Sequence, residues 1–313
     1  MIRKLIAIVI IAFISLFNNS LAADSLEIYL KEAGVAFAKN DFPEALRLFE
    51  EALRFDSLCV NAYKNLGVLH SLRKDYQKSL EYLLKAKDLD SADAEIYNSL
   101  GITYQHLNKK AKALGAYKMA VSLESDNINF IKNLSELLIS QARYSEAELY
   151  LRHALELDTT SAEIYFLMGN IHMARKHYEK CEAYFDSAAA LNPSDPQYLF
   201  YQGFAKDKLE KFDAAEKTYR RVLELQPGHF DARQRLGVVY IILEKYPEAL
   251  EQFEKSIEIK PDDEQALVFL GAAYFYNGMI DESKEVYDYL MEKNPEAAGE
   301  MMKLLPRLDE GGQ

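Results

Sequence analysis

Residues 230–263 read FDARQRLGVVYIILEKYPEALEQFEKSIEIKPDD, and variations on these 34 residues fill most of the 313-residue chain. A glycine recurs at the place of Gly237 every 33 or 34 residues, and Ser135 stands at the centre of the one double interval. A fixed period of this length is typical of solenoids built from stacked repeats. Glycine inside a helical pattern costs about 0.5–1 kcal/mol relative to alanine, so its repetition indicates a contact that leaves no room for a side chain. This column comprises Gly34, Gly67, Gly101, Gly169, Gly203, Gly237 and Gly271.

The rest of the quoted repeat predicts two amphipathic helices, the first of which carries the glycine. Downstream of it, Ala249, Phe253 and Ser256 follow one another at intervals of four and three residues. This spacing places all three on one face of a second helix. Pro261 ends that helix, because proline disfavours helical backbone at the residue before it. We therefore expect each repeat to be a pair of closely packed antiparallel helices.

These columns resemble the tetratricopeptide repeat (TPR), and the resemblance covers residues 27–297. It implies an all-α, right-handed α-solenoid of eight helix-turn-helix repeats, with residues 298–313 as a C-terminal capping helix and tail. The residues that carry the resemblance include Leu66, Gly67, Tyr104, Ala113, Tyr117, Ala120, Gly237, Tyr240, Ala249, Phe253 and Pro261. We assign the repeats to residues 27–59, 60–93, 94–127, 128–161, 162–195, 196–229, 230–263 and 264–297.

The resemblance also implies a binding surface. In TPR proteins the first helix of each repeat lines a concave groove, and repeat positions 2, 5, 9 and 12 commonly face a bound peptide. Carried over, these positions are polar in the first four repeats, where Lys64 and Lys132 stand among them. In the last four repeats they are mostly apolar, with candidate partner-binding residues Phe166, Asn170, Met173, Phe200, Phe204, Val238, Ile241, Val268 and Phe275.

A contiguous exposed apolar surface generally marks an interaction site. Our hypothesis is that repeats five to eight hold an apolar or amphipathic segment of a partner protein. The alternative is that these side chains pack against neighbouring helices and narrow the groove.

The N-terminal residues 1–23 have the pattern of a secretory signal peptide. Arg3 and Lys4 precede an apolar run over residues 5–17, and Ser20 and Ala22 are the small residues expected before a cleavage site. The run is shorter than the roughly 17–25 residues of a spanning helix. We therefore expect an exported, periplasmic protein without a membrane span in its mature chain. The alternative is an uncleaved signal that anchors the chain to the inner membrane.

Composition argues against a nucleic-acid partner. The chain has 37 Lys and Arg against 49 Asp and Glu, which gives a formal charge of −12 and a pI of about 5.1. An acidic chain of this kind does not offer the broad basic surface that polyanions require. The two cysteines, Cys59 and Cys181, lie in well-separated repeats, so we expect free, buried thiols rather than a disulfide.

No residue pattern predicts an enzyme. Ser71 and Lys74 have the spacing of an acyl-enzyme S-x-x-K motif, and residues 125–127 spell S-D-N, but no K-T-G follows. The histidines and cysteines lack metal-ligand spacing, and no glycine-rich phosphate loop is present, so we expect neither metal nor cofactor. The predicted function is a non-enzymatic interaction scaffold. Two alternatives are a structural subunit of a cell-envelope assembly, secretion or pilus complex, and a domain associated with an enzyme.

Overall fold

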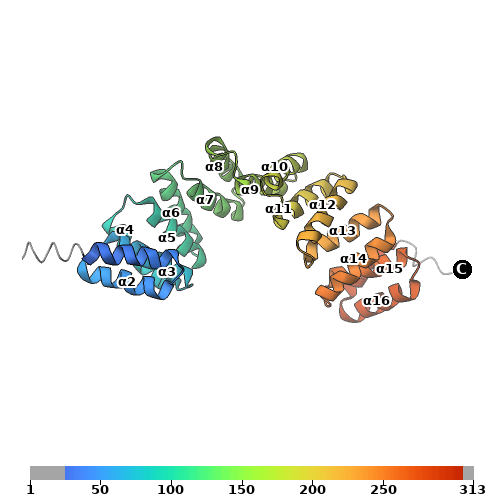
Figure 1. The fold of residues 1–313 in the computed structure, drawn as a ribbon. Coiled ribbons are helices and arrows are strands. Elements are labelled where there is room, and N and C mark those ends of the chain that lie inside the picture. The colour runs from blue at the N-terminus through green and yellow to red at the C-terminus, as the bar shows by residue number, and fades with distance from the viewer. Residues whose placement is uncertain (1–24, 306–313) are drawn as a thin grey trace, which may run out of the picture. The chain divides into compact units, whose positions relative to one another are not determined.

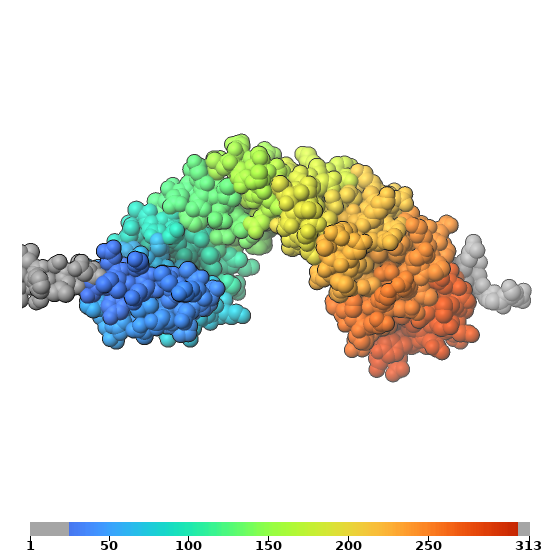
Figure 2. Space-filling view, viewed as in Figure 1, coloured from blue at the N-terminus to red at the C-terminus, as the bar shows by residue number. Residues whose placement is uncertain are grey.

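The structure of this chain is a computed structural model that describes residues 25–305, and these residues are helical throughout apart from short turns (Figure 1). The chain divides between Leu157 and Asp158 into two compact bodies, which we call the N-terminal and C-terminal halves. In the space-filling view the atoms of each half form a continuous surface (Figure 2). None of the helices within residues 25–305 is both long and apolar enough to cross a membrane.

The N-terminal half contains four helix pairs. Each pair joins a first helix of the repeat to a second helix through a tight turn, and the second helix then contacts the first helix of the next repeat. Its elements are a helical segment over residues 25–38, α2 (Phe42–Phe55), α3 (Val60–Leu72), α4 (Tyr76–Leu89), α5 (Ala94–His106), α6 (Lys110–Leu123), α7 (Ile128–Ser140) and α8 (Tyr144–Leu157).

The C-terminal half repeats this arrangement and adds one helix. Its elements are α9 (Ala162–Ala174), α10 (Tyr178–Leu191), α11 (Pro196–Lys208), α12 (Phe212–Leu225), α13 (Phe230–Ile242), α14 (Tyr246–Ile259), α15 (Glu264–Tyr276), α16 (Ile280–Lys293) and α17 (Pro295–Leu304). The predicted all-α architecture of TPR-type helix pairs with a final capping helix is thereby confirmed.

The glycine column works as the sequence predicts in most repeats. A Cβ atom at Gly237 would lie 2.6 Å from the Phe253 ring, and one at Gly203 would lie 2.9 Å from the Tyr219 ring. Real Cβ atoms do not approach other atoms so closely, so only glycine lets the two helices of the repeat come this near. In the last repeat Gly271 instead meets the side chain of Met301 from α17.

Gly34 does not belong to this column, which corrects the expected register of the first repeat. A Cβ at Gly34 would meet nothing within 4 Å, whereas its neighbour Ala33 is fully buried. The turn between the two helices gives the reason. One residue there has a positive φ, and this residue recurs every 34 positions from the first repeat to the last. The first repeat therefore begins at residue 26, and its small residue is Ala33. The positive-φ column comprises Asn40, Lys74, Asn108, Ala142, Lys176, Glu210, Glu244 and Gly278.

Helix α17 covers the end of the C-terminal half. Asn294 caps its N-terminus, accepting hydrogen bonds from the backbone of Glu296 and Ala297, and Pro295 occupies the first turn, where no backbone donor is needed. Met301 and Leu305 are buried against α15 and α16, as expected for a terminal cap. The cap begins at Pro295, a little before the predicted residue 298.

The two cysteines are free and buried, as predicted. Cys59 lies in the N-terminal half and Cys181 in the C-terminal half. Burial raises the pKa of the Cys181 thiol to about 12, so this group stays protonated near neutral pH.

Candidate functional site

Four first helices of the C-terminal half, α9, α11, α13 and α15, enclose a pocket of about 600 Å³. We call it the aromatic pocket because four aromatic side chains from α11 and α15 line it. Every lining residue comes from a first helix, and the TPR resemblance implies that these helices line the binding groove. The lining residues are Met173, Phe200, Tyr201, Phe204, Asp231, Gln234, Arg235, Val238, Gln265 and Phe269.

Four predicted binding residues meet in this pocket: Met173, Phe200, Phe204 and Val238. They come from three consecutive repeats, so the pocket depends on the stacking of the repeats. The three side chains from α11 and α13 are half-buried, which leaves part of each apolar surface open to the pocket. The alternative that such side chains only pack against neighbouring helices holds in part for Phe200, whose ring stacks on His229 at a centroid distance of 5.0 Å.

The other predicted residues of this half lie outside the pocket. Phe166 packs on the rings of Phe185 and Tyr201, at centroid distances of 5.5 and 5.1 Å, and so supports the pocket wall from behind. Ile241 is half-buried against the core. Asn170 is half-buried on α9, and its Oδ1 atom is buried without a hydrogen-bond partner among the described residues.

Val268 and Phe275 belong to the core beneath the cap. Val268 is only 2% exposed and packs with Ala298 and Met301 of α17, so it does not line an open groove. Phe275 joins the same cluster and meets Tyr276 edge-on. At Val268 and Phe275 the expected groove surface is therefore covered by α17, whereas Gln265 and Phe269 of the same helix line the aromatic pocket.

Of the six other lining residues, Asp231, Gln234 and Gln265 occupy repeat positions 2 or 5, which the resemblance assigns to the groove. The remaining three lie at none of the predicted positions: Tyr201, Arg235 and Phe269. All three occupy the sixth position of their repeats. A residue at position 6 follows position 2 by one helical turn and precedes position 9 by three residues, so it shares their face. The sixth position of the repeat was therefore a signal in the sequence for these three residues.

Charged groups hold the Phe204 ring in place. The guanidinium of Arg235 lies 4.9 Å from the ring centroid and Nζ of Lys208 lies 5.4 Å from it, both within the range of cation–π attraction. Arg235 also approaches Oδ2 of Asp207 at 3.5 Å. Burial raises the pKa of the Asp207 carboxyl, although Arg235 and Lys208 act in the opposite direction. The two cations at this pocket are thus already engaged within the chain: Arg235 and Lys208 contact the Phe204 ring, and Arg235 also lies near Asp207.

The two predicted lysines lie in the N-terminal half. Nζ of Lys64 donates hydrogen bonds to Oδ2 of Asp93 at 2.8 Å and to Oε2 of Glu95 at 2.6 Å. Burial lowers the pKa of Lys64, but these two carboxylates outweigh it and the net pKa is raised. The Lys64 charge is therefore engaged within the chain. Lys132 is half-buried on α7.

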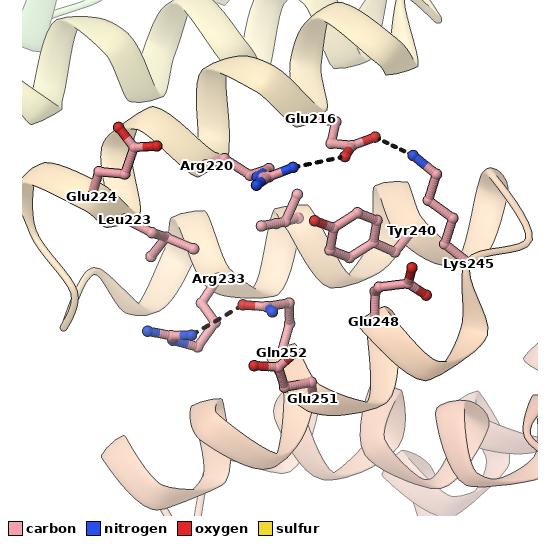
Figure 3. Close-up of a pocket in the computed structure, with 11 residues that line it drawn as sticks. Glu216, Arg220, Leu223, Glu224, Arg233, Tyr240, Lys245, Glu248, Glu251 and Gln252 are labelled. Atoms are coloured by element: carbon pink, nitrogen blue, oxygen red, sulfur yellow. Dashed lines mark hydrogen bonds and ion pairs between the residues drawn. The ribbon is translucent and has the colours of Figure 1, made fainter.

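A second pocket, of about 590 Å³, opens between α12, α13 and α14, and charged side chains line it (Figure 3). Glu216 of α12 lies 2.6 Å from Nζ of Lys245 and 3.7 Å from the Arg220 guanidinium. Arg233 donates to Oε1 of Gln252 at 3.0 Å. None of the predicted binding residues lies here. Within residues 25–305 no group of three or more His, Cys, Asp or Glu side chains is arranged to hold a metal ion.

Comparison with known proteins gives the same repeat. Family models described as tetratricopeptide repeat match residues 30–94, 138–199 and 202–264, which together exceed half of the chain. No curated protein matches the chain significantly.

Several solved structures share the fold. A tetratricopeptide repeat protein from Parabacteroides merdae is 18% identical, with a TM-score of 0.58, over 79% of this chain and 98% of its own. The C-terminal part of a TPR repeat-containing protein from Cytophaga hutchinsonii is 15% identical, with a TM-score of 0.62, over 77% and 99%. YrrB, described as a TPR protein with an unusual peptide-binding site, is 26% identical, with a TM-score of 0.52, over 60% and 97%. With its stacked helix pairs and with family matches over more than half of its length, the chain belongs to the tetratricopeptide repeat proteins.

Proposed function

We propose that this protein is a non-enzymatic scaffold that binds a segment of a partner protein, and that the aromatic pocket receives an apolar side chain of that segment. The observation that carries the proposal is the convergence of Met173, Phe200, Phe204 and Val238 on one pocket of about 600 Å³. Pockets of this size, apolar with a few polar groups at the edge, are the usual form of a side-chain or ligand site. A few buried aromatic anchors commonly supply most of the binding energy at such a site.

The likeness to YrrB supports a peptide as the bound partner, because that TPR protein has a peptide-binding site. An extended or helical peptide can run along the first helices and place one side chain in the aromatic pocket. The polar rim supplies hydrogen-bonding groups for its backbone, since Gln234 and Gln265 both line the pocket.

We also propose that the protein acts after export, in the periplasm. The pattern of residues 1–23, which lie outside the described residues, supports this location. N-terminal sequencing of the protein isolated from its native cells tests it, together with fractionation of those cells. A periplasmic protein that begins near Asp24 fits the proposal, whereas a membrane-bound protein that begins at Met1 requires the anchored alternative.

Capture of partners by the purified protein tests the pocket. Phe204→Ser and Val238→Ser remove apolar surface from the pocket and should each reduce recovery of specifically bound partners at least tenfold. Ile259→Ser is the matched control, because Ile259 is 40% exposed on α14 and does not line the pocket. Circular dichroism checks that all variants keep their helices. Equal recovery by the pocket variants and the control would contradict the proposed site.

The alternative of a structural subunit in an envelope assembly makes a different prediction. Such a subunit stays in a stable complex when intact cells are gently crosslinked, and the pocket variants do not release it. A scaffold that binds peptide segments loses its partner in the Phe204→Ser variant.

A further inference from the structure

The first repeat exposes apolar residues at positions that are buried in every later repeat. With the repeat starting at residue 26, Ile28 and Val35 occupy its third and tenth positions, and they are 54% and 47% exposed. In the seven later repeats these positions are at most 8% exposed. The third position holds Ala62, Ile96, Phe130, Ile164, Tyr198, Ala232 and Ala266, and the tenth holds Leu69, Thr103, Leu137, Ile171, Ala205, Val239 and Ala273.

The difference follows from stacking. Within each half, the second helix of one repeat covers the first helix of the next, as α2 covers α3 and α12 covers α13. The helical segment over residues 25–38 has no preceding second helix among the described residues. Its apolar stripe therefore remains uncovered within residues 25–305, although it is built like the stripes that are covered elsewhere.

This surface has the composition of an interface. A pocket of about 520 Å³ lies on it, and both apolar and charged side chains line this pocket. Interfaces between proteins commonly combine apolar and polar residues. The apolar lining residues are Ile28, Val35, Ala36 and Leu48, and the charged ones are Lys31, Glu32, Lys39, Asp41 and Glu44. We call these nine residues the N-terminal face.

The opposite end of the repeat series cannot serve as the complement of this face. In the last repeat, α17 packs on α15 and α16 and buries Val268, Ala272 and Leu290. A second copy therefore offers no open stack end for head-to-tail addition there. What a second copy does offer is its own N-terminal face, which would make the contact symmetric about a twofold axis.

The exposed helix is complementary to itself in the antiparallel direction. When two copies of residues 25–38 lie antiparallel with Ile28 opposite Val35 of the second copy, the same register sets Lys31 opposite Glu32 of the second copy. The twofold axis repeats both contacts, so two apolar pairs and two opposite-charge pairs form together. Lys31 and Glu32 are exposed and form no ion pair within residues 25–305, so both charges are available for this contact.

We propose that the N-terminal face binds a second copy of this chain through this antiparallel, twofold pairing. The contact covers Ile28 and Val35 as a preceding helix covers their counterparts in later repeats. It lies on the N-terminal half and leaves the aromatic pocket of the C-terminal half uninvolved. A dimer of this kind carries two aromatic pockets, which increases the apparent affinity for a partner that presents two segments.

Sedimentation equilibrium of the full chain, as recovered from the expressing cells and with its N-terminus determined by mass spectrometry, tests the proposal. The expected result is a species of twice the chain mass. Val35→Glu should convert it to a monomer. Leu149→Glu, at a residue 69% exposed on α8, is the matched control and should leave the dimer intact.

Charge reversal makes the test specific to this register. Glu32→Lys sets like charges opposite each other at two places, and we expect it to weaken dimerisation at least tenfold, as should Lys31→Glu. The double variant Lys31→Glu, Glu32→Lys restores opposite charges at both places and should recover the dimer. A monomeric parent chain at about 100 µM would overturn the proposal, because dimers weaker than this correspond to less than about 5.5 kcal/mol of binding free energy. A double variant as defective as the single ones would also overturn it.

Discussion

Gly237 on α13 lies directly against the ring of Phe253 on α14, so close that a Cβ atom at position 237 would be 2.6 Å from Cζ of the ring. Phe253 is fully buried and cannot move aside without disturbing the core around it. The pair therefore sets the distance between the two helices of the seventh repeat. Gly67 with Leu83 and Gly203 with Tyr219 repeat the relationship in other repeats.

The Gly237→Ala variant should be less stable than the parent. Alanine is the better helix former, but its methyl group has no space beside Phe253, and overpacking of a core typically costs about 1–3 kcal/mol. Thermal unfolding followed by circular dichroism measures the loss. Gly115→Ala is the control, because Gly115 also lies within a helix, α6, but a Cβ there meets nothing within 4 Å. The control should gain about 0.5–1 kcal/mol, and a loss in both variants would contradict the steric explanation.

The positive-φ column in the turns between paired helices offers a second test of the fold. Glu244 has a φ of 58° and thus adopts a left-handed conformation that is unfavourable for a residue with a side chain. Glu244→Gly should therefore increase the free energy of unfolding by about 0.5–1 kcal/mol. A higher midpoint of thermal unfolding measures this gain. Gly278 occupies the same place in the last repeat with a φ of 77°, and Gly278→Ala should lower stability by a similar amount. Changes of the same sign in both variants would refute this account of the turn.

The positive-φ column also explains why the register of the first repeat could not be predicted from the sequence. The periodic glycine and the small residues on the second helix were sufficient to predict the helix pairs. The predicted register of the first repeat was wrong by one residue. Gly34 stands beside the buried Ala33, and we aligned Gly34 with the glycine column in its place. The structural marker that fixes the register is backbone φ. Asn, Lys, Ala, Glu and Gly all occupy that position, so no residue type reveals it.

The candidate site could also be predicted only in part, because a non-repeating helix covers part of it. Family positions led to Met173, Phe200, Phe204 and Val238, which do converge on the aromatic pocket. They also led to Val268, which α17 covers. A repeat pattern describes what one repeat offers to its groove, but the burial of a last repeat depends on the non-repeating helix that follows it.

Lys64 should contribute to stability rather than to partner binding. It joins α3 to the start of α5 through Asp93 and Glu95, and its side chain and that of Asp93 are 21% and 19% exposed. Lys64→Met leaves the Asp93 carboxylate partly buried without this partner and should cost about 1 kcal/mol. Urea unfolding measures this cost, and 1 M NaCl should reduce it. Arg54→Met removes the more exposed pair with Glu51 and should change stability by less than about 0.5 kcal/mol. If Lys64→Met is as stable as this control, the contact is not structural.

The cap should release when its buried methionine is made charged. Met301 is fully buried and its Sδ and Cε atoms fill the space beside Gly271. Met301→Asp should cost about 3 kcal/mol or more, because an unpaired carboxylate cannot remain in this core. Hydrogen exchange should then increase in α17 and in α15 beneath it. Leu304→Asp, at a residue 38% exposed, should leave that exchange almost unchanged.

Asp207 beside the aromatic pocket should make stability depend on pH in a predictable direction. Burial raises the pKa of its carboxyl in the folded protein, so the folded state binds the proton more tightly than the unfolded state. This group therefore opposes folding at neutral pH, and its unfavourable contribution disappears as the pH falls through the folded pKa toward the unfolded one. The Asp207→Asn substitution imitates the protonated carboxyl at every pH, because the amide that it introduces carries no charge.

The Asp207→Asn variant should accordingly melt at a higher temperature than the parent at pH 7, and the difference should shrink as the pH is lowered to about 4, near the ordinary pKa of an aspartate. Thermal melts between pH 4 and 8 measure this. Asp231→Asn provides the comparison, since Asp231 lines the same pocket but is exposed. If Asp207→Asn melts lower than the parent at pH 7, the attraction of Arg235 exceeds the effect of burial, and the charged form of Asp207 is the one that the fold requires.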